Sequence, residues 1–192
     1  MLIQLPIHRV RSIEISTICW CHFAAFSILQ HYPEEGGETL PLKHLAAVAR
    51  GLVNPPYDIF KENLIVFGKL CEKFQVRTKH YFVARATERV DGVANISIGK
   101  ARESVKESLS KRLPMVVWGM RTSSRWGQET VHAHAMVIYG IRMEREKLLV
   151  HDPNTVASED SVGADFEPFL ADLFEDRELG ISWLTTFRKA LV

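Results

Sequence analysis

Hydrophobic residues follow a helical period through most of residues 19–74. Apolar positions recur three and four residues apart there, which is typical of helices that bury one face. The pattern predicts an extended stretch and then three helices, over about residues 1–18, 19–32, 42–52 and 57–74. The helix over 19–32 is apolar most of the way round, so we expect it to be buried on nearly all sides.

The remaining residues are dominated by shorter apolar runs of strand character. These predict strands over about residues 76–83, 115–119, 131–141, 147–151 and 181–187, helices over 98–112 and 166–173, and a polar surface loop over 121–130. Residues 131–141 and 147–151 should form a hairpin across 142–146. The chain therefore predicts a single α+β domain over 1–192, in which a helical N-terminal lobe (1–75) packs on a mostly antiparallel β-sheet lobe (76–192).

Composition and charge exclude several classes of function. Hydrophobic residues make up 46% of the 192 and charged residues 24%, as in folded soluble proteins. Lys and Arg total 24 against 23 Asp and Glu, a net charge of +1 that gives no reason to expect binding to nucleic acid or to an acidic membrane. No apolar run is long enough to span a membrane, and residues 1–15 lack the pattern of a signal peptide. We expect a cytoplasmic protein, although secretion without a cleavable signal would leave no such pattern.

Three cysteines, at 19, 21 and 71, are too few for a disulfide framework and suit a reducing compartment. Cys19 begins the first predicted helix. The helix dipole and the unpaired N–H groups there would lower the pKa of its thiol and favour a reactive thiolate. The commoner role of a cysteine is that of a small buried apolar residue, so Cys19 alone does not define a site.

Two later residues could complete a catalytic group. His134 lies on the predicted strand 131–141, where it shares one face with His132. Asp152 ends the next strand, and Asn154 follows two residues later as a competing partner for the imidazole. A carboxylate beside a histidine can fix its tautomer and stabilise its charged form. Each residue also has an ordinary structural explanation: a histidine bonded to a neighbouring strand, and an Asp-Pro turn.

Together these residues resemble the pattern of the papain-like cysteine peptidase superfamily. Its members place Cys-Trp at the start of a long buried helix, as Cys19-Trp20 does, and the histidine in a His-Ala-Val-like strand with a glycine six residues later, as His134 and Gly140 do. The orienting Asn or Asp follows the next strand, as Asp152 does. The Asp-Pro step is similar to bacterial branches, among them bacteriocin-processing peptidases and the cysteine-protease effectors of plant-associated bacteria.

The resemblance implies a peptidase that acts on peptide or protein through a thioester, without cofactor or metal. Cys19 would be the nucleophile, His134 the general base and Asp152 the residue that orients it.

One element of the family pattern is missing. Papain-like enzymes usually carry a glutamine about six residues before the nucleophile, which helps to bind the oxyanion, and Ile13 stands there. Loss of an oxyanion donor can cost about 100- to 1000-fold in rate. A catalytically silent papain-like domain that binds a partner protein is therefore the alternative. Zinc binding is disfavoured, because the Cys-x-Cys and His-x-His spacings differ from those of structural zinc sites.

Overall fold

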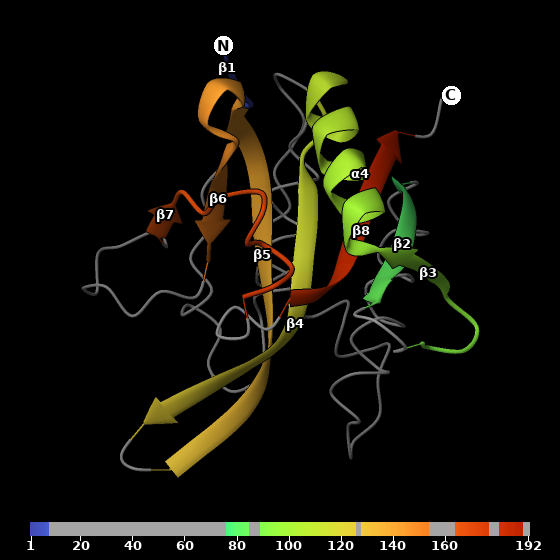
Figure 1. The fold of residues 1–192 in the computed structure, drawn as a ribbon, viewed down its shortest axis with the longest axis vertical. Helices are drawn as coiled ribbons and strands as arrows, with labels where there is room; N and C mark the ends of the chain where they lie inside the picture. The colour runs from blue at the N-terminus through green and yellow to red at the C-terminus, as the bar shows by residue number, and fades with distance from the viewer. Residues whose placement is uncertain (8–75, 85–88, 126–127, 154–163, 177–180, 190–192) are drawn as a thin grey trace.

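The computed structural model describes residues 1–7, 76–84, 89–125, 128–153, 164–176 and 181–189 (Figure 1). The helices expected over 19–32, 42–52 and 57–74 lie outside these residues, as does the lobe boundary expected near residue 75. Within the described residues the protein is α+β, with one α-helix on a mostly antiparallel sheet.

The described strands form one sheet in the order β3-β2-β8-β4-β5-β6-β7, and β1 pairs with β5 off this path. Only β2 and β3 run parallel; the other neighbours are antiparallel. The strands are β1 (Leu2–Gln4), β2 (Val76–Ala84), β3 (Ala94–Ser97), β4 (Met115–Arg125), β5 (Gln128–Arg142), β6 (Lys147–Asp152), β7 (Ala164–Phe166) and β8 (Ile181–Lys189).

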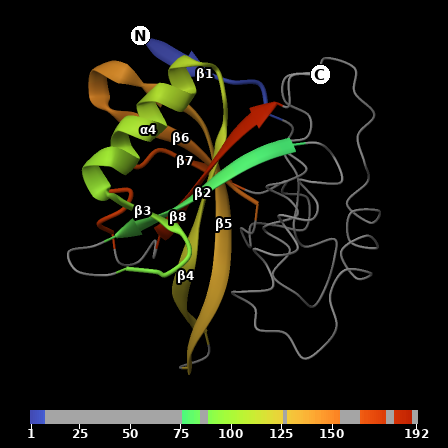
Figure 2. The same cartoon turned by 90° about the vertical axis from the view of Figure 1, so that its right-hand side faces the viewer.

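The helix predicted over 98–112 is confirmed as α4 (Ile98–Ser110). Ser97 caps it, because its hydroxyl accepts a hydrogen bond from the backbone N–H of Lys100 at 3.2 Å. The helix lies against one face of the sheet (Figure 2). Its buried apolar residues, Ala101, Val105 and Leu109, belong to the main hydrophobic core.

The cross-strand register assigns residues to the two faces of the sheet. Met115 pairs with Ile138 and Val117 with Met136, and all four are fully or almost fully buried in the core that contains α4. Residues of opposite parity lie on the second face, where Trp118 stacks on Trp183 with ring centroids 5.0 Å apart. Phe82 meets Trp183 edge to face at 5.2 Å. Both faces of the central strands are therefore buried.

The loop predicted over 121–130 is wrong. β4 and β5 pair continuously from Met115↔Ile138 to Arg125↔Gln128, which leaves only 126–127 between the two strands. Polar composition did not exclude a strand here, because the backbone N–H and C=O groups of both segments satisfy each other across the ladder.

The helix predicted over 166–173 is also wrong. Strand β7 ends at Phe166, Pro168 follows, and Phe169 forms an isolated bridge with Lys147 before the chain turns over 170–175. The ring of Pro168 fixes φ and removes a donor, but its carbonyl accepts a hydrogen bond from Leu148 N–H at 2.9 Å. Tertiary pairing with β6 therefore replaces the local helical pattern.

The predicted hairpin between β5 and β6 is confirmed, with a short 3₁₀ turn (Met143–Arg145) between them. A bulge between Ile138 and Gly140 shifts the register, so the alternation expected over 131–141 holds only as far as Ile138. Gly140 has no room for a side chain, because a Cβ would lie 2.5 Å from the carbonyl oxygen of Ile3 and 2.8 Å from Leu149 Cδ1. The glycine lets the backbone of β1 approach β5 closely where the two strands pair.

Candidate functional site

His134 and Asp152, which the sequence pattern singled out, lie side by side on two neighbouring strands, the first in the middle of β5 and the second at the end of β6. His134 is on β5 opposite Gly119, and Asp152 is the last residue of β6. His134 Nε2 lies 3.0 Å from Asp152 Oδ1. The side chains are 3% and 6% exposed, so the pair is shielded from solvent. Strand alternation and the β5–β6 hairpin together account for this placement.

The contact is close enough for a charge-assisted hydrogen bond, but the carboxylate oxygen lies off the direction of the ring N–H. It is therefore an ion pair when the ring is protonated, without the alignment of a strong hydrogen bond. Catalytic hydrogen bonds are often poorly aligned before substrate binds. The geometry fixes one further point: Nε2 is the nitrogen that faces the carboxylate, so Nδ1 is the nitrogen on the other edge of the ring.

The other candidate residues lie outside what the structure describes. Cys19 and Asn154 fall in undescribed segments, and of His132 only the backbone is described. The structure thus brings together His134 and Asp152, while the contact of either with Cys19 stays a prediction.

A second histidine–carboxylate pair lies one residue away along β6. His151 is fully buried, and its Nδ1 is 2.8 Å from Asp165 Oδ1 on β7. The hydroxyl of Tyr139 donates to the other oxygen of Asp165 at 3.1 Å. The Nε2 of His151 is buried and makes no hydrogen bond to the described part of the chain. We call these three residues the His151 cluster.

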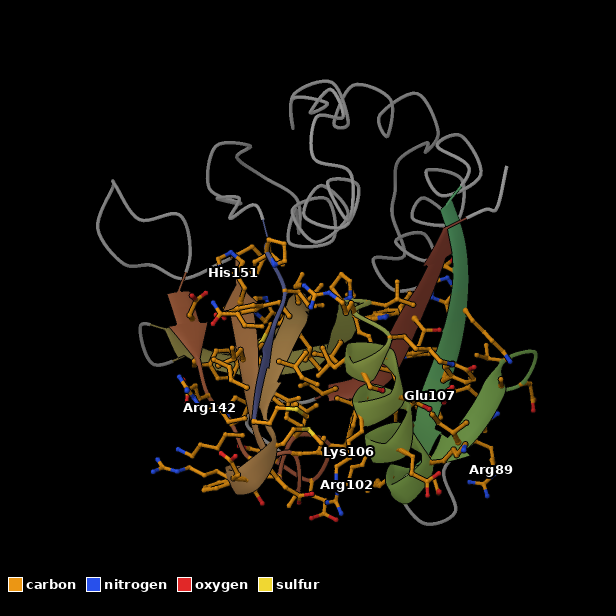
Figure 3. All side chains as sticks on the ribbon, turned by 90° about the horizontal axis from the view of Figure 1, so that it is seen from above. Arg89, Arg102, Lys106, Glu107, Arg142 and His151 are labelled. Atoms are coloured by element: carbon orange, nitrogen blue, oxygen red, sulfur yellow. The ribbon has the colours of Figure 1, made fainter. Side chains whose placement is uncertain are left out.

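The two pairs lie on opposite faces of the sheet. His151 is opposite Val137, and His134 has the parity of Met136, which is in the core with α4. His151 accordingly lies on the side of the sheet away from α4 (Figure 3). Sequence reasoning missed Asp165 because no element was predicted between the strand 147–151 and the helix expected over 166–173. Leu149 and His151 alternate on one face of the predicted strand, but the Asp165-Phe166 pair is too short to predict the strand that lies beside it.

A third polar group lies on the same face as His151. Thr185 Oγ1 accepts a hydrogen bond from Trp118 Nε1 at 3.1 Å and lies 2.8 Å from His80 Nδ1. Burial lowers the pKa of His80 below its ordinary value of 6.5. His80 is therefore disfavoured as a cation, and the threonine satisfies polar groups within the aromatic layer.

Within the described ranges, no three His, Cys, Asp or Glu side chains are arranged to hold a metal ion. The described part of the chain also contains no helix that is long and apolar enough to cross a bilayer. A scan against protein-family models finds no match to the chain, and no curated protein is detectably similar to it.

Proposed function

We propose that the protein is a papain-like cysteine hydrolase, with a helical N-terminal lobe over 1–75, and that its substrate is a peptide or protein. The observation that carries the proposal is the buried His134–Asp152 pair, with 3.0 Å between Nε2 and Oδ1. The positions of Gly140 and Pro153 in the sequence indicate the same two residues. Their proximity supports the resemblance at the one place where the described residues bear on it.

The reaction begins with transfer of the Cys19 thiol proton to His134. Because Nε2 faces Asp152, Nδ1 is the nitrogen that would take this proton. Asp152 stabilises the resulting imidazolium by its negative charge. The thiolate attacks the substrate carbonyl carbon, and the resulting oxyanion would accept a hydrogen bond from the backbone N–H of Cys19.

Collapse of the tetrahedral intermediate breaks the bond to the leaving amine, which takes the proton from His134. A thioester on Cys19 remains. Water then attacks the thioester and gives its proton to His134, and the carboxylic acid product leaves as the thiol is restored. Isopeptides, glutamine amides and acyl acceptors could use the same groups, but a peptide is the simplest substrate for them.

Cleavage of a peptide library by the purified protein tests the proposal. Cys19→Ala should abolish cleavage, whereas Cys21→Ala should retain most of it, because Cys21 is rotated by about 200° from Cys19 on a helix. His134→Ala should also abolish cleavage. Loss of cleavage in Cys21→Ala but not in Cys19→Ala would overturn the assignment of the nucleophile.

The His151 pair supplies a direct control for the choice of base. His151→Asn keeps a side-chain N–H for Asp165 but cannot act as a base, so it should retain cleavage. If His151→Asn is inactive while His134→Ala is active, the second pair is the catalytic one. If no peptide is cleaved and no thiol is activated, the silent, partner-binding domain is the better account.

A further inference from the structure

The His151 cluster joins three neighbouring strands at the point where Asp152 leaves the sheet. Tyr139 comes from β5, His151 from β6 and Asp165 from β7. Backbone pairing matches this side-chain contact, because His151 lies opposite Asp165 and the next residue, Asp152, lies opposite Ala164. The side chains of His151 and Asp152 point to opposite faces of one short strand, so the strand cannot shift or rotate at one without moving the other.

β7 is the edge strand of the described sheet and pairs with β6 through only three residues. A ladder this short is easily frayed, and side-chain contacts across it have a large share in fixing its register. The cluster supplies such contacts: a charged carboxylate that accepts from an imidazole N–H and from a phenol. Tyr139 is the extra residue of the bulge in β5, which explains how its hydroxyl can reach past β6 to Asp165.

We propose that His151, Asp165 and Tyr139 are positioning residues, which hold the end of β6 so that the Asp152 carboxylate stays against Nε2 of His134. This inference rests on the proposed function for its catalytic consequence. Its structural content, that the cluster sets the Asp152–His134 contact, can be measured whether or not the protein is an enzyme.

Only the Nδ1 side of His151 takes part. Nδ1–H donates to Asp165, whereas Nε2 is buried without a hydrogen bond to the described residues. The amide nitrogen of asparagine can take the place of Nδ1 and donate in the same direction. His151→Asn should therefore preserve the positioning, and His151→Leu, which is similar in bulk but has no donor, should lose it.

The test reads the His134 ring by ¹⁵N nuclear magnetic resonance of histidine-labelled protein. In the wild type, a carboxylate facing Nε2 favours the form that carries a proton on Nε2. Asp152→Ala gives the reference pattern for a ring without its partner. Asp165→Asn and His151→Leu should move the His134 signals toward that reference, Tyr139→Phe should move them part of the way, and His151→Asn should leave them near wild type.

Glu167→Gln is the matched control. Glu167 follows β7 directly and pairs with Arg142 at the far end of β5, with 3.0 Å between Nη2 and Oε1. It ties the same two regions together at the surface, away from Asp152. Its removal should leave the His134 signals unchanged. An equal shift in Glu167→Gln and Asp165→Asn would mean general loosening of the sheet and would overturn the proposal.

Alkylation of Cys19 at mildly acidic pH gives the catalytic readout. Misplacement of a reacting group by about 1 Å can cost up to 100-fold in rate. Asp165→Asn should therefore slow alkylation by roughly 10- to 100-fold, whereas His151→Asn should leave it near the wild-type rate. If Asp165→Asn shifts the His134 signals but wild-type Cys19 is no faster than Cys71, the positioning holds and the proposed function fails. If Asp165→Asn does not fold, the positioning role is tested by comparing Tyr139→Phe, which should shift the His134 signals, with His151→Asn, which should not. Unchanged His134 signals in folded Asp165→Asn, or in Tyr139→Phe where it replaces that variant, overturn the positioning role.

Discussion

Gly140→Ala should detach or displace β1, although alanine is acceptable to the backbone at this position. The φ angle of Gly140 lies outside the left-handed region, so the restriction comes from contact alone. A Cβ would lie 2.5 Å from the Ile3 carbonyl oxygen, 2.8 Å from Leu149 Cδ1 and 3.2 Å from Gln4 Cα, where ordinary contacts begin at 3.4 Å. The backbone of β1 would have to retreat by roughly 1 Å, because the β5 backbone is held by β4 up to Ile138 and by β6 from Gly140 onward.

Two contributions set the magnitude. Overpacking of this kind costs about 1–3 kcal/mol. Retreat of β1 also weakens the hydrogen bond from Leu5 N–H to the Tyr139 carbonyl, 2.8 Å in the structure, and the burial of the Leu5 side chain, which is 1% exposed. Full loss of that burial would add about 1.5–3 kcal/mol. We expect the free energy of unfolding to fall by about 2–4 kcal/mol.

Urea unfolding followed by tryptophan fluorescence measures this change, and Leu5→Ala supplies the control. If Gly140→Ala acts by displacing β1, it removes part of the Leu5 burial, and that part of the free energy of unfolding is already lost in a Leu5→Ala background. The double variant should then be more stable than the sum of the two single effects predicts, by about 1 kcal/mol or more. Strict additivity, or a loss below about 0.5 kcal/mol for Gly140→Ala alone, refutes the reasoning.

Two further predictions concern the polar group on the second face of the sheet. Thr185→Val removes the acceptor of Trp118 Nε1–H and the partner of His80 Nδ1. It should lower the free energy of unfolding, measured by urea titration, by about 1–3 kcal/mol. The control is Thr186→Val, next to it on β8, which should change this free energy by less than about 0.5 kcal/mol. Burial lowers the pKa of His80 from its ordinary 6.5, so the unfolded chain takes up a proton there at higher pH than the folded protein does. The contribution of neutral His80 to the free energy of unfolding is therefore fully present above pH 6.5, and it is lost as the pH falls toward the folded pKa. His80→Gln should therefore lose less stability than the wild type between about pH 7 and pH 5, and identical pH profiles would contradict the assignment.

Local patterns were sufficient for the pieces of the sheet that surround the candidate site. The alternation through His134, the short apolar run before Asp152 and the turn residues between them predicted a hairpin, and β5 and β6 confirm it. A hairpin brings residues together through neighbouring segments, so sequence alone can place its side chains relative to one another. This is why the contact between His134 and Asp152 could be anticipated.

Features that depend on distant pairing were not predictable in the same way. β7 is three residues long, and only its contact with β6 makes it a strand, so Asp165 gave no sign of meeting His151. The bulge at Tyr139 lies where β5 begins to pair with β1, more than 130 residues earlier in the chain. The outer parts of β4 and β5 looked like a loop because their composition is polar, whereas their structure follows from pairing with each other.

The most direct test of the account is the rate at which each cysteine is alkylated at mildly acidic pH, followed residue by residue by mass spectrometry. Iodoacetamide or the peptidase inhibitor E-64 would serve as the reagent. An activated thiolate reacts at a pH where ordinary thiols are protonated. Cys19 should be labelled much faster than Cys21 and Cys71 in the wild type, and Asp152→Ala should slow Cys19 toward the rate of the other two while circular dichroism stays unchanged. Equal labelling of the three cysteines, or a Cys19 rate indifferent to both His134→Ala and Asp152→Ala, would contradict a catalytic Cys19–His134–Asp152 group.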